Sequence, residues 1–367
     1  MRILARICAS AALCTPALAH AQNVLLGGQI KLGLDATSVS GAANPGGTAS
    51  RVFRESNQTS FFFLDGKEDL GNGARALYHL EWDFSADTGA QGAGRAFYVG
   101  VDSATFGRLQ LGRQSVYFSH HWFITDTHGA FDAAPSAANS LNVIGSINGA
   151  NFAGNYLNNT VRYETPDFGG FAVMASYSFD AEQPGAGRNR TWYLSPSYTK
   201  GPLNIGFYHM QRNSQGILPL QTVGSLDQMA DKLAFGYTYN GLRLGAVVDR
   251  NRVDDKVTGS RQDRIAFAVP LSYATGPHLF SLTYGQALPV HQNGSTLAET
   301  GARMLSVSYQ YSLSKRTWLD VTAVELRNQS NGRYNFWLGG LNGSSPLPLQ
   351  DAGARVRMYY AGIKHQF

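Results

Sequence analysis

The chain has 367 residues, of which 15% are charged and 12% are aromatic, and it contains 41 glycines. Soluble domains carry about 25% charged residues, whereas coiled coils and disordered chains combine dense charge with few aromatic residues, so the composition excludes the last two classes. The longest apolar run, residues 7–19, is shorter than the roughly 20 residues that a membrane-spanning helix needs.

Residues 1–21 have the pattern of a cleaved export signal. Arg2 and Arg6 flank the start of an apolar segment, and the sequence Ala-His-Ala at residues 19–21 matches a small-residue cleavage site. We therefore expect a mature chain of residues 22–367, exported from the cytoplasm.

The two cysteines, Cys8 and Cys14, would leave with this signal. Leu13 stands where a lipid-attachment site would need a small residue, which argues against a lipoprotein. The mature chain would have no thiol, so disulfides, cysteine nucleophiles and thiolate metal sites are excluded. Without Arg2 and Arg6 of the signal, the mature chain would keep 28 of the 30 basic residues and 25 acidic residues. No run of basic residues indicates nucleic-acid binding.

The mature chain has a hydrophobic period of two. Between Arg75 and Phe84, nine of ten positions fit an alternation of apolar and polar side chains, which predicts a β-strand, because a helix would mix the two sets. The same alternation recurs at residues 171–179, 233–239, 242–248 and 305–311.

Short turns alternate with longer polar connections between these strands. The turns are rich in Gly, Pro, Asn or Ser and fall at residues 65–73, 104–107, 167–169, 200–202, 240–241, 275–277 and 313–315. They divide the chain into sixteen strands with eight longer connections. An even number of antiparallel strands, with short turns at one end and long loops at the other, predicts an all-β, 16-stranded transmembrane β-barrel that forms a single domain.

The longest connection runs over residues 119–158 and shows no strand alternation. A segment of this length in a compact domain is usually functional. A sixteen-stranded barrel encloses a water-filled lumen, so we expect this loop to fold inward as a constriction. A loop on the outer surface is the alternative. Its acidic residues Asp126 and Asp132 are candidate pore-lining groups, and it also contains His120, His121 and His128.

Several motifs, in chain order, resemble the general trimeric porins of β-proteobacteria. Residues 66–73 (GKEDLGNG) resemble their G-x-E-D-L-G-x-G turn, and residues 111–114 (LGRQ) resemble the motif before their constriction loop. Residues 158–170 (NNTVRYETPDFGG) are similar to the motif after that loop. Residues 313–317 (LSKRT) and the terminal 362–367 (GIKHQF), with its C-terminal Phe, complete the set.

The resemblance implies an outer-membrane porin, a homotrimer in contact with outer-membrane lipid and lipopolysaccharide, that passes small hydrophilic solutes and ions by passive diffusion. The third external loop and the facing wall would form the constriction. We assign to this constriction Lys31, Phe61, Arg75, His79, Glu81, Asp83, Arg113, Asp126, Asp132, Arg162 and Glu164.

Strand parity predicts which charged side chains point inward. The inward set, besides His79, is Lys31, Arg75, Glu81, Asp83, Arg162, Glu164, Lys232, Arg243, Asp249, Arg264, Arg316, Asp320 and Lys364. It contains eight cations and five anions. We therefore expect a weak anion preference, which the two loop acids would reduce further.

The chain departs from the family at several wall positions. The first strand has Lys31 where the family usually has Asp, and Phe61 and Ala96 stand where wall cations are expected. Tyr156 replaces an arginine found in some members. The constriction is therefore expected to be less charged and more aromatic than usual, which favours amphipathic or aromatic solutes as an alternative.

Two arginines have the parity of lipid-facing residues. Arg95 shares parity with Phe97 and is expected at the rim, with its guanidinium reaching water. Arg113 shares parity with Leu111, so pairing with carboxylates at the rim is an alternative to lining the pore.

Other function classes have weaker support. Residues 71–76 match a dinucleotide fingerprint only in spacing, because a strand rather than a helix follows. We expect no catalytic residue, cofactor or metal site. His79 and Asp83 share a face without a placed serine, which disfavours an outer-membrane hydrolase. A receptor or adhesin barrel that binds through loops 213–229 and 328–353 remains an alternative.

Overall fold

The computed structural model describes residues 23–41, 51–117, 143–151, 153–154, 156–179, 190–215, 225–336 and 352–367. The export signal predicted at residues 1–21 lies outside these ranges. Within them the regular elements are β-strands of one antiparallel sheet. No helix in the described part is long and apolar enough to cross a membrane.

The strands are β1 (Asn23–Ser40), β2 (Arg51–Asn57), β3 (Ser60–Gly71), β4 (Ala74–Phe84), β5 (Gln91–Ser103), β6 (Gly107–Ser115), β7 (Tyr156–Glu164), β8 (Phe171–Ser178), β9 (Arg190–Lys200), β10 (Leu203–Gln215), β11 (Ser225–Tyr239), β12 (Leu242–Asp255), β13 (Ser260–Thr275), β14 (His278–Ala287), β15 (His291–Gln292), β16 (Ser295–Thr296), β17 (Ala302–Ser312), β18 (Thr317–Asn328) and β19 (Arg355–Gln366).

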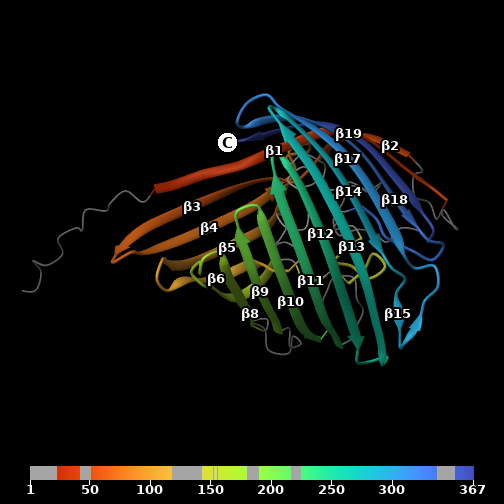
Figure 1. Ribbon diagram of the computed structural model, residues 1–367, viewed down its shortest axis with the longest axis horizontal. Helices are drawn as coiled ribbons and strands as arrows, with labels where there is room; N and C mark the ends of the chain where they lie inside the picture. The colour runs from red at the N-terminus through yellow and green to blue at the C-terminus, as the bar shows by residue number, and fades with distance from the viewer. Residues whose placement is uncertain are drawn as a thin grey trace, which may run out of the picture.

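The sheet closes on itself because the first and last strands pair, with Gln29 opposite Gln366 and Ser40 opposite Arg355 (Figure 1). β2 and β3 pair with successive parts of β1 and act as one strand, interrupted at Thr59, where φ is 70°. The two-residue strands β15 and β16 form a small hairpin beyond β14. The described chain is thus a closed barrel of sixteen antiparallel strands, which confirms the predicted fold.

Each of the short connections predicted from the sequence contains a turn or a bend in the structure, but residues 65–71 of the first one belong to β3. The connection between β12 and β13 is also short, at residues 256–259, so the prediction of a long loop there was wrong. β12 and β13 are 14 and 16 residues long. The polar residues that suggested a loop instead extend the strand ladder.

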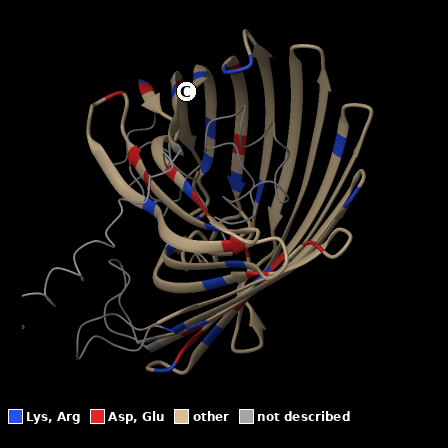
Figure 2. Cartoon of the chain, turned by 90° about the vertical axis from the view of Figure 1, so that its left-hand side faces the viewer, with Lys and Arg blue, Asp and Glu red and all other residues tan. Residues whose placement is uncertain are grey.

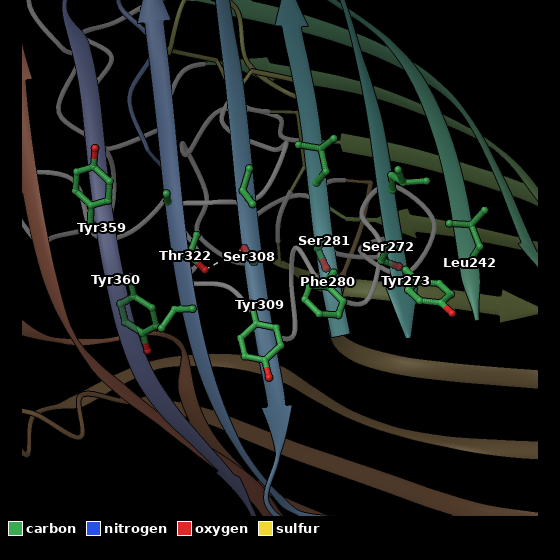
Figure 3. Close-up of a pocket in the computed structure, with 15 residues that line it drawn as sticks. Leu242, Ser272, Tyr273, Phe280, Ser281, Ser308, Tyr309, Thr322, Tyr359 and Tyr360 are labelled. Atoms are coloured by element: carbon green, nitrogen blue, oxygen red, sulfur yellow. Dashed lines mark hydrogen bonds between the residues drawn. The ribbon is translucent and has the colours of Figure 1, made fainter. Parts of the chain in front are cut away.

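Side chains alternate between the two faces of the wall. One cross-strand row of neighbours on β13, β14, β17 and β18 is buried and hydroxylated, and consists of Ser272, Ser281, Ser308 and Thr322. Thr322 Oγ1 donates a hydrogen bond of 2.9 Å to Ser308 Oγ (Figure 3). The opposite face carries exposed apolar and aromatic side chains such as Tyr273 and Phe280. This arrangement is the inverse of a soluble barrel and suits hydrocarbon outside and water inside.

The interior also contains an apolar cluster that the sequence did not predict. Small and flexible side chains on the inward positions of β10–β19 pack around Val143, Ile144 and Ala153 of the long β6–β7 connection. They include Met210, Ala230, Ala234, Val247, Ala266, Ala268, Met304, Val324, Leu326, Val356 and Met358. Strand parity alone predicted that these inward positions would line a polar, water-filled lumen. They are apolar because a loop segment covers them.

Candidate functional site

The end of the long β6–β7 connection lies inside the barrel, against the wall formed by β11 and β12. The Gly145 N–H donates to Asp249 Oδ1 at 3.0 Å. Asn251 Nδ2 donates to the carbonyl oxygens of Gly145 and Asn151 at 3.2 and 2.9 Å. Gln228 Nε2 donates to the same Asn151 carbonyl at 2.8 Å. Two neighbouring strands therefore hold the backbone of this segment through side chains that parity places inward.

Asp249 is the centre of this anchor. Besides Gly145, it accepts a hydrogen bond of 2.5 Å from the hydroxyl of Tyr117, at the start of the same connection. Arg264 Nη1 on β13 lies 2.9 Å from its Oδ1, and both side chains are 0% exposed. Burial, and then the Asp249 carboxylate, raise the pKa of Tyr117 well above its ordinary value. The phenol therefore keeps its proton and remains a donor.

A second contact joins this segment to the β18–β19 connection. The Asn148 N–H donates to the hydroxyl of Tyr334 at 3.1 Å, and Asn148 Oδ1 accepts from the Arg333 N–H at 2.8 Å. Burial raises the pKa of Tyr334. Two connections far apart in the sequence thus meet inside one end of the barrel.

Arg95 points into the barrel, which corrects the prediction of a lipid-facing rim residue. Leu80 of β4 pairs with Phe97 of β5, whereas Trp82 pairs with Gly94. The two β5 residues Arg95 and Ala96 therefore lie opposite the single β4 residue Glu81, which is a β-bulge. Such a bulge reverses the facing of the residues before it. The wall cation that the family resemblance leads one to expect at position 96, where this chain has Ala96, is therefore supplied by Arg95.

The Arg95 guanidinium is buried among carboxylates and rings. Its Nε lies 2.9 Å from Glu81 Oε1, and its Nη1 lies 3.1 Å from Asp83 Oδ1. Its Cζ stands 4.7 Å from the centroid of the Phe61 ring and 5.6 Å from that of Tyr156. Two aromatic residues that replace the family's usual cations thus flank one arginine.

A second charged group lies nearer the short turns. Arg75 Nη2 is 2.6 Å from Asp102, and Arg108 contacts both Asp102 at 3.3 Å and Glu164 at 3.4 Å. Asp102 and Arg108 were missed in the sequence, where they adjoin a turn. Register with Arg75 and Glu164 would have identified them.

An aromatic stack adjoins the Arg95 group, because His79 Nε2 lies 3.4 Å from Glu81 Oε2. The His79 ring lies 5.6 Å from Phe63 and 5.2 Å from Tyr98, at interplanar angles of 26° and 20°. His79 Nδ1 is 2.6 Å from Asp65 Oδ1. Asp65 is a further inward residue that the sequence assigned to a turn.

The other assigned residues are dispersed along the wall. Lys31 is 2% exposed on β1, opposite Lys364. Arg162 is 5% exposed and donates to the Ser115 carbonyl. Arg113 donates to Asn158 Oδ1 at 2.6 Å and to the Gly94 carbonyl on β5. Asp126, Asp132 and the three loop histidines lie outside the described residues.

Charged positions occur along the strands themselves and not only in the connections (Figure 2). Within the described ranges no group of three or more His, Cys, Asp or Glu side chains could hold a metal ion. The described interior side chains include fixed charges, hydroxyls and rings as well as the apolar cluster, and fixed charges lining a passage select ions by sign.

Known proteins share this architecture. Residues 8–331 match the family model described as Gram-negative porin. Outer membrane porin protein 32 of Delftia acidovorans is 26% identical, over 84% of this chain and 85% of its own. An anion-selective porin from Comamonas acidovorans superposes with a TM-score of 0.76 at 22% identity, covering 94% of this chain and 100% of its own. The trimer form of OmpT from Vibrio cholerae gives a TM-score of 0.71 at 13% identity, covering 94% and 99%.

The family match and the relatives point to a channel rather than an enzyme. The apolar outer face of the wall, the closed barrel and the family match over most of the chain all agree with a channel. The chain belongs to the Gram-negative porin family and is an outer-membrane channel for passive diffusion.

Proposed function

We propose that this porin is a weakly anion-preferring channel whose constriction lies between the inward segment of residues 143–151 and the facing wall of β3–β7. The observation that carries the proposal is the anchoring of that segment on Asp249, because these hydrogen bonds hold the loop on the inner side of β12 and so support a constriction there. The wall opposite contributes the Arg95 and Arg108 charge groups.

The charge balance of the inward positions supports a weak preference. The basic residues at these positions in the described strands are Lys31, Arg54, Lys67, Arg75, Arg95, Arg108, Arg162, Arg212, Lys232, Arg243, Arg264 and Lys364, and the acidic ones are Asp35, Asp65, Asp69, Glu81, Asp83, Asp102, Glu164, Asp249, Asp255 and Asp320. The small basic excess attracts anions, while the ion pairs at Arg95, Arg108 and Arg264 neutralise much of it. The anion selectivity of the Comamonas relative agrees in sign.

A preference for aromatic or amphipathic solutes is a second candidate. The Phe63–His79–Tyr98 stack and the Phe61 and Tyr156 rings beside Arg95 favour it. Rings on a channel wall attract the faces and edges of planar solutes, and each contact contributes about 0.5–1.5 kcal/mol.

We also propose that the protein is a homotrimer exported by a cleaved signal at residues 1–21, with residues 22–367 as the mature barrel. The trimeric form of the Vibrio cholerae neighbour supports the assembly. The pattern of Arg2, Arg6 and the Ala-His-Ala site supports the signal.

Planar-bilayer recording of the purified full-length product tests the channel properties. We expect ohmic steps grouped in threes and a reversal potential of small magnitude, on the anion side, in a KCl gradient. Liposome swelling with sugars of increasing size should give a graded cutoff. A strong cation preference would contradict the proposed charge balance, and the absence of size-dependent uptake would contradict an open constriction.

A further inference from the structure

His79 is an inward histidine of β4 that lies between two carboxylates. Its Nδ1 is 2.6 Å from Asp65 Oδ1 on β3, and its Nε2 is 3.4 Å from Glu81 Oε2 on its own strand. β3, β4 and β5 are consecutive neighbours in the wall (Figure 1). The His79 side chain is 17% exposed, so the ring can exchange a proton with the lumen although both of its nitrogens face protein groups.

The geometry of this contact favours the charged form of the ring. An ionised carboxylate only accepts hydrogen bonds, whereas a neutral imidazole has one N–H donor and one nitrogen with a lone pair. In the neutral ring of His79, one nitrogen would point its lone pair at a carboxylate oxygen. The imidazolium donates from both nitrogens and fits both carboxylates. The rings of Phe63 and Tyr98, which stack on His79 at 5.6 and 5.2 Å, also favour a cation, since ring faces attract positive charge.

Strand register fixes which ionisable groups surround His79 on the lumen side. Its direct partners lie on β3 and β5, and the two flanking inward rows add further residues of β3, β4 and β5. The ionisable members of this shell are Asp65 and Lys67 of β3, Glu81 of β4, and Arg95 and Tyr98 of β5. Arg95 is shared between Glu81 and Asp83. With Asp83 included, three carboxylates face one lysine and one arginine, so a protonated His79 makes the group neutral and a deprotonated one leaves a net charge of −1.

Loss of the proton breaks one of the two carboxylate contacts and spares the other. Nδ1 keeps its hydrogen, because its contact with Asp65 is the shorter one. Nε2 then faces Glu81 with a lone pair. Glu81 is still held by Arg95 Nε at 2.9 Å, so this carboxylate keeps a donor. The charge of the wall therefore changes by one unit while the side chains around His79 keep their partners.

We propose that His79 determines the ion selectivity of this wall and changes it with pH. The inference rests on the proposed function, because β3–β5 must line the ion path. With the imidazolium present, the wall is neutral and the basic excess of the lumen attracts anions. After loss of the proton, the wall carries an uncompensated negative charge, which attracts cations and repels anions. An isolated imidazole titrates at about pH 6.5, in a range where ordinary carboxylate, lysine and arginine side chains keep their charge.

The test measures the reversal potential of the reconstituted full-length product in a KCl gradient at about pH 5 and about pH 9, on either side of the imidazole titration. In the wild type, the anion-to-cation permeability ratio should be about twofold lower at the higher pH, which is the effect of one unit charge roughly 8 Å from the ion in water. His79→Phe keeps an uncharged ring in the stack, so it should show the lower ratio at both pH values. His79→Arg stays charged, so it should show the higher ratio at both.

His278→Gln is the matched control. His278 of β14 also lies in an aromatic stack, 6.0 Å from the ring of Tyr309, and its Nδ1 is 2.8 Å from the Tyr309 hydroxyl. It shares parity with the exposed Phe280 on the outward face, so its titration does not act on ions in the lumen. This variant should show the full wild-type change between the two pH values.

Three results would overturn the role of His79. They are a pH-independent ratio in the wild type, the full wild-type change in both His79 variants, or loss of the change in the His278 control. A ratio that favours cations at both pH values but still falls about twofold at the higher one would support the role of His79 and contradict the proposed anion preference. The two proposals can therefore fail separately, because the first is a difference between two pH values and the second is the sign at each.

Discussion

Replacing Asp249 with alanine should release the inward loop segment and destabilise the barrel. The change removes the acceptor of the Tyr117 hydroxyl and of the Gly145 N–H, and it removes the partner of Arg264. Both Asp249 and Arg264 are fully buried. A cation is then left in the interior without its carboxylate.

The expected loss follows from this geometry. Breaking a buried ion pair by removing one partner costs about 3–5 kcal/mol. The two hydrogen bonds to the charged acceptor are each worth about 1.5–3 kcal/mol, but they share Asp249 with the ion pair and do not add to it in full. We therefore expect the free energy of unfolding to fall by about 3–5 kcal/mol.

The assay combines urea unfolding in detergent with single-channel recording. The Asp249→Ala variant should unfold at lower urea and show increased open-channel noise. Adding Arg264→Met should restore most of the stability, since a buried pair replaced by apolar side chains is close to neutral. The noise should persist, because Tyr117 and Gly145 still lack their acceptor. Stability within about 1 kcal/mol of wild type in the single variant, or quiet channels in both, would refute the anchoring role.

Three other substitutions test the wall. Arg95→Gln leaves two carboxylates uncompensated, and one unit charge at roughly 8 Å in water is worth about 0.5 kcal/mol. The reversal potential in a KCl gradient should then report a permeability ratio shifted about twofold toward cations, and an unchanged ratio would place Arg95 outside the ion path. Phe63→Ala removes a ring stacked on His79, so current block by benzoate should weaken about twofold to tenfold while acetate is unaffected. Equal block by benzoate in variant and wild type would argue against an aromatic wall. Gly112→Ala places a side chain at φ 140° and against a backbone carbonyl of β5, at a cost of about 1–3 kcal/mol. The folded fraction on unheated SDS gels should fall, and a wild-type fraction would show that β6 tolerates a side chain at position 112.

The sequence predicted the architecture because a membrane barrel repeats one local rule. Each strand alternates between lipid and lumen, and each short turn needs Gly, Pro, Asn or Ser, so a window of ten residues carries enough information. The turns at 240–241 and 275–277 and the alternation of β4 were all readable without tertiary contacts. The error at 256–259 arose because strands that extend beyond the membrane are polar on both faces and resemble a loop.

The interior depended on tertiary structure. Parity assigned Arg95 to lipid, and a β-bulge visible only in the pairing with β4 turned it inward. Asp102 and Arg108 became wall residues through register with Arg75 and Glu164. No local sequence pattern shows where a β-bulge adds one residue to a strand, because a bulge is defined by the pairing of two strands.

Sequence alone thus determined that this chain alternates, turns and closes as an exported sixteen-stranded barrel. Tertiary structure decided which inward positions carry the loop and which charged side chains meet across strands. Tyr117 and Asp249 are 132 residues apart, and Arg95, Glu81 and Phe61 meet from three different strands. The physical reason is that alternation fixes the face of a side chain, whereas strand register and loop docking fix its neighbours, and the charge and hydrogen bonding of the lumen depend on those neighbours.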